Sequence, residues 1–272
     1  MKGLIALALA ALLVTPALAQ NSGLRRLTDR DDLFGWEAVG RLDIAEQGFC
    51  TGTLIAPDLV LTAAHCAFDG RTGAHYRAGE ITFRAGFRDG TSVADRRVVQ
   101  IVTPSEFRAS GAVSAERIRV DVALMRLDDP VPTALADPFA LHSGDVSGSE
   151  ISVSSYGRGR AEAISRQRAC QMLWRQQGLI AFDCDVTFGS SGAAILAREG
   201  SRGRVLSLVS AGGVVDGRSI GYGMELADTV ATLKQKLRAN APAPAANIRR
   251  LQVGGSLSSG TSGAKFLRPG GS

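Results

Sequence analysis

The sequence predicts an all-β protein with two strand-rich halves and one closing helix. Short apolar runs rich in Val, Ile and Phe, broken by Gly, Asp and Pro, recur between residues 36 and 131. A second series covers residues 150–226, and a segment with helical periodicity follows it. Runs of this length and spacing are typical of antiparallel barrels or sandwiches.

The expected strands follow one another along the chain. In the first half they lie within four segments: 52–65, 80–87, 96–102 and 119–127. In the second half they lie within five: 150–157, 179–186, 192–197, 204–215 and 219–226. A Pro-bearing stretch at 128–142 interrupts the apolar pattern. We therefore expect a boundary there, between a first domain at 36–135 and a second at 136–238.

The last part of the chain changes character. Apolar residues recur at helical spacing over 225–238, and Lys and Arg occupy the last turns: the apolar positions are Leu226, Val230, Leu233 and Leu237. This pattern predicts an amphipathic helix. Beyond it, residues 239–272 are low in complexity and rich in Gly, Ser, Ala and Pro, which predicts a disordered tail.

The first residues have the layout of a secretory signal peptide. One Lys precedes an apolar run at 4–14, and small residues end at Ala19. The run is shorter than the roughly 20 residues of a spanning helix, and the residue directly after Ala19 is Gln20 and not a Cys, so we expect no membrane or lipid anchor. We expect export to the periplasm or the extracellular space. The soluble product would begin with a short N-terminal segment or propeptide at 20–35.

The net charge of +5 is modest and comes mostly from Arg. The basic residues are scattered except for a cluster at 158–168, which no nucleic-acid-binding motif accompanies. Such a cluster is more often a solvated face than a nucleic-acid surface. We therefore expect no nucleic-acid partner.

Four cysteines remain in an exported chain: Cys50, Cys66, Cys170 and Cys184. An even number in an oxidising compartment predicts two disulfides, for which three connectivities are possible. Pairing in sequence order is the simplest, and each loop of about 15 residues would contribute roughly 3 kcal/mol of stability. A zinc site is the competing interpretation, but no close Cys pair supports it. We expect no metal.

Three side chains are candidates for hydrolytic chemistry. His65, one of only three histidines, ends an apolar run beside Cys66, and a disulfide there would fix the imidazole as a general base requires. Asp121 stands in an otherwise apolar run, where either an ion pair with a local Arg or the orientation of a histidine could compensate it. Ser191 lies between glycines whose amides could converge on one point, although such loops are also common as plain turns.

Together, the segments GFCTGTLIAPDLVLTAAHC, DVALMRL and GSSGA occur in the order His, Asp, Ser. They resemble the chymotrypsin-like (trypsin-type) serine peptidases, and most of all the compact bacterial branch that includes the glutamyl endopeptidases. The resemblance covers residues 36–238. It implies two antiparallel six-stranded Greek-key barrels with the site in the cleft between them. It also implies a serine endopeptidase that acts on proteins or peptides without a cofactor, and we expect a monomer.

The resemblance also implies a role for each candidate. His65 would be the general base, Asp121 its orienting acid and Ser191 the nucleophile. The backbone N–H groups of Gly189 and Ser191 would form the oxyanion hole. A disulfide between Cys50 and Cys66 would lie beside the catalytic histidine.

The sequence departs from the family just before the proposed nucleophile. The usual Gly-Asp-Ser-Gly-Gly-Pro is GSSGAA here, so Ser190 cannot form the ion pair that activates the animal digestive enzymes. The N-terminal segment also offers no Ile-Val-Gly-Gly after an Arg. We therefore expect maturation without this pair, by removal of the signal peptide alone or by trimming near Arg25-Arg26.

The residue preferred before the scissile bond is less constrained. Asp185 lies six residues before Ser191, where trypsins carry the acid that selects Arg or Lys, but Thr187 replaces a Cys of the trypsins. Asp185 therefore fits either a pocket acid or a structural carboxylate. Small residues would form the other pocket wall: Ser210, Gly212 and Gly221. No His follows His142, which disfavours the cleavage after Glu that glutamyl enzymes perform.

Other classes fit less well. An α/β-hydrolase esterase needs its His after the Ser in chain order, and none follows here. A zinc hydrolase would need a cluster such as HExxH, which the sequence lacks. A non-catalytic pseudopeptidase that acts as a secreted binding protein is the alternative to an enzyme. Such proteins usually lack a triad residue, whereas all three are present here.

Overall fold

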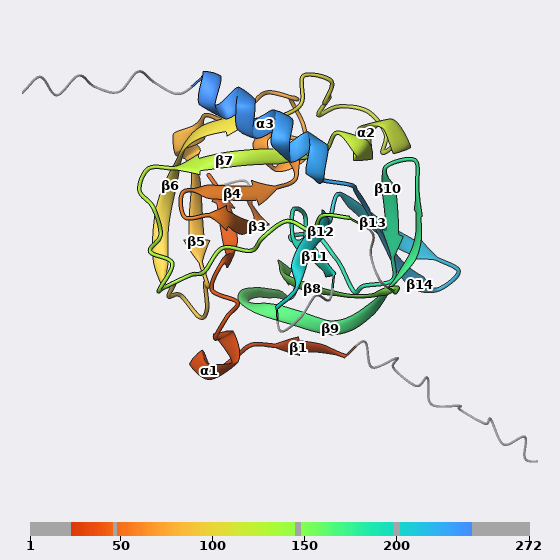
Figure 1. Cartoon of the computed structure of the whole chain (residues 1–272), viewed down its shortest axis with the longest axis horizontal. Coiled ribbons are helices and arrows are strands. Elements are labelled where there is room, and N and C mark those ends of the chain that lie inside the picture. Colours follow the sequence, from red (N-terminus) through yellow and green to blue (C-terminus); the bar gives the residue numbers. More distant parts are fainter. Residues whose placement is uncertain (1–22, 46–47, 145–147, 198–201, 241–272) are drawn as a thin grey trace, which may run out of the picture. The chain divides into compact units, whose positions relative to one another are not determined.

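A computed structural model describes residues 23–45, 48–144, 148–197 and 202–240 (Figure 1). The expected signal peptide at 1–19 lies outside these ranges, and so does the expected tail at 239–272, except for Ala239 and Asn240, which end the C-terminal helix. Within them, no helix is both long and apolar enough to cross a membrane.

Six strands of the first half form a closed antiparallel barrel in the order β2-β3-β4-β7-β6-β5. Their bounds are β2 (Val39–Ile44), β3 (Gly48–Ala56), β4 (Leu59–Thr62), β5 (Ile81–Ala85), β6 (Ala94–Val102) and β7 (Ala123–Leu127). All six lie within the expected first domain.

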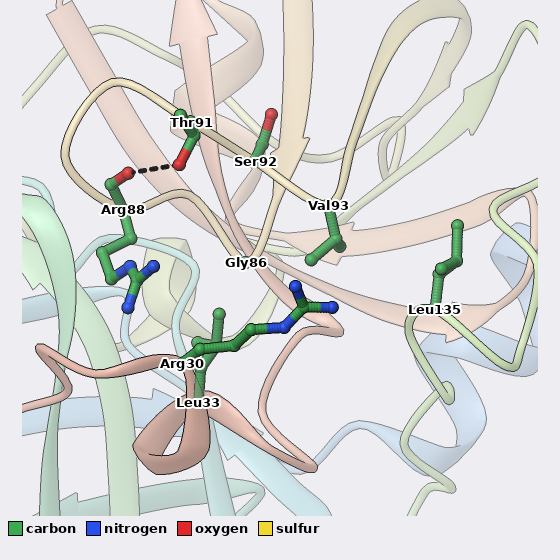
Figure 2. Close-up of a pocket in the computed structure, with 8 residues that line it drawn as sticks. All are labelled: Arg30, Leu33, Gly86, Arg88, Thr91, Ser92, Val93 and Leu135. Carbon is green, nitrogen blue, oxygen red and sulfur yellow. Dashed lines mark hydrogen bonds between the residues drawn. The ribbon is translucent and has the colours of Figure 1, made fainter.

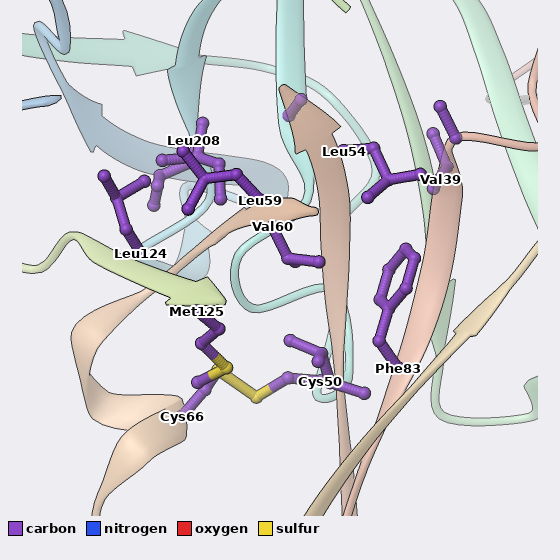
Figure 3. Packing of buried hydrophobic residues seen from close by; sticks show 14 of the residues in the cluster. Val39, Cys50, Leu54, Leu59, Val60, Cys66, Phe83, Leu124, Met125 and Leu208 are labelled. Carbon is purple, nitrogen blue, oxygen red and sulfur yellow. A yellow bond between two sulfur atoms is a disulfide. The ribbon is translucent and has the colours of Figure 1, made fainter. Parts of the chain in front are cut away.

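Alternation of apolar and polar residues is clearest in β5, whereas β4 is buried along its whole length. β5 reads Ile-Thr-Phe-Arg-Ala and buries Ile81, Phe83 and Ala85, because every second side chain of a strand points to the same face. Figure 3 shows Phe83 in this core together with Leu54 of β3 and the Cys50–Cys66 disulfide. The disulfide is part of this core, and Cys66 is the residue directly after His65.

The second half forms a sheet in the order β12-β11-β8-β9-β10-β14-β13, with β1 paired to β9. The bounds are β1 (Leu24–Arg26), β8 (Glu150–Gly157), β9 (Arg160–Gln176), β10 (Leu179–Phe182), β11 (Ala194–Ala197), β12 (Arg204–Leu208), β13 (Ala211–Val215) and β14 (Arg218–Met224). The Ser207 hydroxyl of β12 donates to the Met224 carbonyl of β14 (2.8 Å). The sheet thus curves until β12 meets β14.

Helical segments are short except at the C-terminus. They are α1 (Arg30–Leu33), α2 (Ala115–Arg119), α3 (Ala227–Ala239) and two 3₁₀ turns, η1 (Ala64–Ala67) and η2 (Ala78–Glu80). α3 lies across β6 and β7 (Figure 1) and buries Val230, Leu233 and Leu237, the positions that its periodicity predicts. The all-β prediction, with two barrel-like sheets and a C-terminal helix, is confirmed. β1 and β13 extend the second sheet beyond six strands.

The basic cluster at 158–168 is not a uniformly solvated face. Most of it belongs to β9, the longest strand, which buries Ala163, Ile164 and Ser165. β1 pairs with this strand in the register Arg25↔Arg166. Arg25 and Arg26 therefore lie in a paired strand of the folded chain.

Candidate active site

His65 and Asp121 meet where two paired strands of the barrel end. β4 runs antiparallel to β7 with Thr62 opposite Ala123. His65 follows Thr62 by three residues in η1, and Asp121 precedes Ala123 by two, so both lie at the same end of the pair. The His65 Nδ1 atom lies 2.7 Å from Asp121 Oδ2. The side chain of Asp121 is 4% exposed and that of His65 is 28% exposed.

The Asp121 carboxylate has two further partners. Its Oδ1 atom accepts the backbone N–H of His65 (2.8 Å), and its Oδ2 atom accepts the Ser210 hydroxyl (2.5 Å). These bonds compensate the burial of the charge, as burial of a carboxylate demands. An ionised carboxylate only accepts, so His65 Nδ1 is the donor in this pair, and in the neutral imidazole Nε2 is then the acceptor.

The Cys50–Cys66 disulfide anchors the turn that carries His65. It joins β3 to η1, the turn that carries His65. The second disulfide joins Cys170 to Cys184, so the structure has the pairing in sequence order. The sulfur atoms beside His65 are bonded to each other, so they are not thiolates that could ligate a zinc ion.

Ser191 lies in a tight turn that packs against the segment before His65. Gly189 and Gly192 frame it with φ of +92° and +79°, a region that L side chains rarely adopt. A Cβ at Gly192 would lie 2.0 Å from Thr62 Oγ1 and 2.8 Å from the Ala63 nitrogen. The turn can approach the His65 segment this closely because residue 192 has no side chain.

Thr51, a fully buried residue of β3, ties this turn to the first barrel. Its N–H donates to the Ser191 carbonyl (2.9 Å), and its hydroxyl donates to the Gly189 carbonyl (2.8 Å). The same hydroxyl accepts the Tyr156 N–H (3.1 Å). Within the described part of the chain, the N–H groups of Gly189 and Ser191 donate no hydrogen bond.

The residues expected to line a specificity pocket only partly converge. Gly212 and Gly221 are opposite each other in the β13–β14 pair, and a Cβ at Gly212 would lie 3.2 Å from Val186, the neighbour of Asp185. The Asp185 N–H donates to the Gln167 side chain (2.7 Å). Ser210, expected in the pocket wall, directs its hydroxyl to Asp121.

Several polar residues behind the turn have no counterpart in the sequence-based expectations. Ser190 is fully buried, and its hydroxyl donates to the Tyr156 carbonyl (3.0 Å). Arg160 and Ser155 also reach this hydroxyl, and Thr51 holds the turn from the first barrel. The one sequence signal is that Thr51 and Ser155 stand inside apolar strand patterns.

Two surface hollows lie elsewhere. The one in Figure 2 has a volume of about 290 Å³ and is lined by residues from α1 and the β5–β6 connection together with Leu135. A larger hollow, of about 860 Å³, includes Trp36 and Arg166. Neither is lined by His65, Asp121 or Ser191, so the candidate site is not one of these hollows.

Comparisons with known proteins identify the family of this chain. The profile of the trypsin-like peptidase domain matches residues 50–208, which include His65, Asp121 and Ser191. The chain belongs to the trypsin-like peptidase domain family.

Individual relatives are more distant. The chain is 32% identical over 167 residues to Serine protease SP24D of Anopheles gambiae, a match that covers 54% of this chain and 58% of that protein. It is 24% identical over 190 residues to the glutamyl endopeptidase of Bacillus licheniformis, over 67% of this chain and 57% of that protein. The chain thus spans somewhat more than half the length of these relatives.

A solved Glu endopeptidase structure in complex with MPD has a similar fold. It superposes with a TM-score of 0.64 at 18% identity, and the match covers 80% of this chain and 97% of that one. At this identity the likeness concerns the fold alone.

Proposed function

We propose that this protein is a serine endopeptidase in which His65, Asp121 and Ser191 form the catalytic triad. The observation that carries the proposal is the 2.7 Å contact between His65 Nδ1 and a buried Asp121. A buried carboxylate at this nitrogen orients the ring and stabilises the imidazolium that forms during catalysis. Membership of a peptidase family and the turn at Ser191 support the same assignment.

In this proposal His65 Nε2 takes the proton of the Ser191 hydroxyl as its oxygen attacks the scissile carbonyl. The N–H groups of Gly189 and Ser191, which are free within the described residues, bind the developing oxyanion. A single donor of this kind is worth about 10²–10³ in turnover. His65 then protonates the leaving amine, and water repeats the sequence on the acyl-enzyme.

An extended substrate would pair with β13. This strand is at the edge of its sheet, where its outer N–H and C=O groups are open to another strand. It begins directly after Ser210, whose hydroxyl bonds to Asp121. A peptide along β13 would therefore pass close to the proposed triad.

For specificity we propose that Asp185 selects Arg or Lys before the scissile bond. Its neighbour Val186 approaches Gly212, and Gly212 pairs with Gly221, so the segment that carries Asp185 lies beside the β13–β14 pair. A carboxylate at the pocket base would attract a cationic side chain. The glutamyl preference named for one relative is not carried over, because no His follows His142 in this chain.

We also propose that the protein works outside the cytoplasm as a monomer. Two disulfides suit an oxidising compartment, and the signal-peptide pattern at 1–19 supports export. Arg25 and Arg26 are paired in β1, and Arg26 also forms an ion pair with Asp89. This favours removal of the signal peptide alone over trimming at the two arginines.

A peptide-library digest read by mass spectrometry tests activity and specificity together. We expect wild-type protein to cut after Arg and Lys, and we expect Ser191→Ala to release no products. Asp185→Asn should remove the Arg/Lys preference while cleavage persists. Cleavage mainly after other residues refutes the role of Asp185. Folded wild-type protein that cuts nothing favours the pseudopeptidase.

A further inference from the structure

Arg160 is directed into the protein behind the turn that carries Ser191. It begins β9, and its side chain is partly buried. Its guanidinium donates to the Ser155 carbonyl (2.6 Å), the Ser155 hydroxyl (3.0 Å) and the Ser190 hydroxyl (3.0 Å). Among the described residues it forms no ion pair within 4 Å, so neutral oxygens are its direct partners.

This position is costly for a cation. Burial lowers the pKa of Arg160, although the negative charge of Asp185 opposes the effect. A Cβ at Gly157 would lie 2.8 Å from Arg160 Cζ, so the guanidinium packs closely against the backbone at Gly157. The guanidinium stays charged at neutral pH, so its hydrogen bonds must compensate for the cost of its burial.

The Ser190 hydroxyl is the point at which this cation reaches the turn. It donates to the Tyr156 carbonyl (3.0 Å) and accepts the Thr187 N–H (3.2 Å). The Ser190 backbone closes the turn, since its N–H donates to the Thr187 carbonyl and its carbonyl accepts the Ala193 N–H, both at 2.9 Å. A displacement of Ser190 would therefore move the peptide groups on both sides of it.

One of these peptide groups carries the N–H of Ser191, and the other carries the carbonyl of Gly189, whose own N–H lies one peptide group further back. An oxyanion is stabilised only by donors that are fixed in advance, and a shift of about 1 Å in such a group can cost about 10² in rate. Hydrogen bonds from a charged donor are shorter and stronger than neutral ones, and the planar guanidinium offers several donors in a fixed arrangement.

We infer that Arg160 is a positioning residue, whose guanidinium fixes Ser190 and thereby keeps the N–H groups of Gly189 and Ser191 aimed at the oxyanion. The inference rests on the proposed peptidase function. It adds an explanation of how the oxyanion hole is held in its active geometry. Because the cation is part of β9, the turn is held as soon as the chain folds, and no new chain terminus is needed.

The test measures kcat and KM on a quenched fluorescent peptide that contains the strongest cleavage site from the library digest. We expect Arg160→Met to lower kcat by about 10–100-fold and to change KM by less than about threefold, because oxyanion donors act in the transition state. Arg160→Lys keeps the charge and should return kcat to within about fivefold of wild type. A kcat within twofold of wild type for folded Arg160→Met overturns the inference.

Arg166→Met is the matched control. Arg166 lies on the same strand, is also partly buried, and its Cζ atom lies 3.9 Å from the centre of the Trp36 ring. Among the described residues, no hydrogen bond or ion pair joins it to the turn. We expect this variant to lose thermal stability and to keep its kcat. Equal losses of kcat in the Arg166 and Arg160 variants would show a general structural effect and overturn the inference.

A second pair of variants tests whether the side chains of residues 160 and 190 are coupled, so the test does not rely on the single variant Arg160→Met. Ser190→Asp places a carboxylate beside the guanidinium, and we expect this variant to fold and to cleave the peptide. The same substitution in the Arg160→Met background buries a carboxylate without its cation, so we expect loss of activity and a lower Tm. If Ser190→Asp behaves alike in both backgrounds, the two side chains are not coupled and the inference fails.

Failure of the proposed function gives a different result. A wild-type protein that neither cleaves peptides nor reacts with a fluorophosphonate refutes the peptidase and the inference built on it. An active wild type with an indifferent Arg160 refutes only the inference.

Discussion

Thr51 offers a prediction that links stability to catalysis. Its single hydroxyl donates to the Gly189 carbonyl and accepts the Tyr156 N–H, at 2.8 and 3.1 Å. Thr51→Val keeps the shape of the side chain but removes both bonds. Thr51→Ser keeps the hydroxyl and is the matched control.

The size of the effect follows from burial. The Tyr156 N–H is in a fully buried residue, and loss of its partner costs about 1–3 kcal/mol, whereas the Gly189 carbonyl is partly exposed and loses less. We expect the free energy of unfolding to fall by about 2 kcal/mol. For a domain of this size that corresponds to a decrease in Tm of about 4–8 °C. We also expect kcat to fall by about 10-fold or more, because the Gly189 peptide becomes less well fixed.

Urea unfolding followed by tryptophan fluorescence gives the first quantity, and turnover of the fluorescent peptide gives the second. Thr51→Ser should lie close to wild type in both. The reasoning is refuted if Thr51→Val unfolds at the wild-type urea concentration and keeps its kcat. A loss of stability with unchanged kcat would refute only the link from Thr51 to the catalytic turn.

Three further predictions concern other contacts of the site. Ser210→Ala removes one of three hydrogen bonds to Asp121, so we expect kcat to fall by about 3–10-fold with KM unchanged in peptide hydrolysis; an unchanged kcat would contradict this. Replacing Cys50 and Cys66 together by Ser opens a 16-residue separation, so we expect a loss of about 3 kcal/mol in urea unfolding and lower activity; equal stability would contradict this. Burial raises the pKa of Tyr156 well above its ordinary value of 10, so the folded state binds more protons than the unfolded chain above pH 10. The stability of wild type relative to Tyr156→Phe should therefore fall by about 1.4 kcal/mol per pH unit above pH 10 in urea unfolding, and a pH-independent difference would contradict this.

The parts of the fold that the sequence predicted share a simple pattern. In β5 the apolar residues alternate, and in α3 they recur every three or four residues, so one buried face is visible in the letters alone. β9 was different because charged residues interrupt its buried positions. Its side chains are accommodated by partners that are distant in sequence, as Arg166 is by Trp36.

The same limit applies to the site. His65, Asp121, Ser191 and the neighbouring disulfide could be proposed from the sequence because each residue lies in a recognisable local motif. Thr51 and Arg160 carry no such mark. Their partners lie 138 and 30 residues away, and only the tertiary structure brings them together.

Ser210 has a contact that the sequence analysis did not predict. It was expected in the wall of the pocket because of its place in the family pattern, but its hydroxyl bonds to Asp121. The direction of a short side chain depends on local backbone geometry, which a sequence motif does not specify.

The most direct test of the proposed triad is the location of a covalent label. Wild-type protein is treated with a fluorophosphonate, digested, and mapped by mass spectrometry across the peptide that contains both Ser190 and Ser191. We expect one label, on Ser191, which disappears in Ser191→Ala and forms much more slowly in His65→Ala. A label on another residue, or no label on folded wild-type protein, would contradict the assignment of Ser191 as the nucleophile.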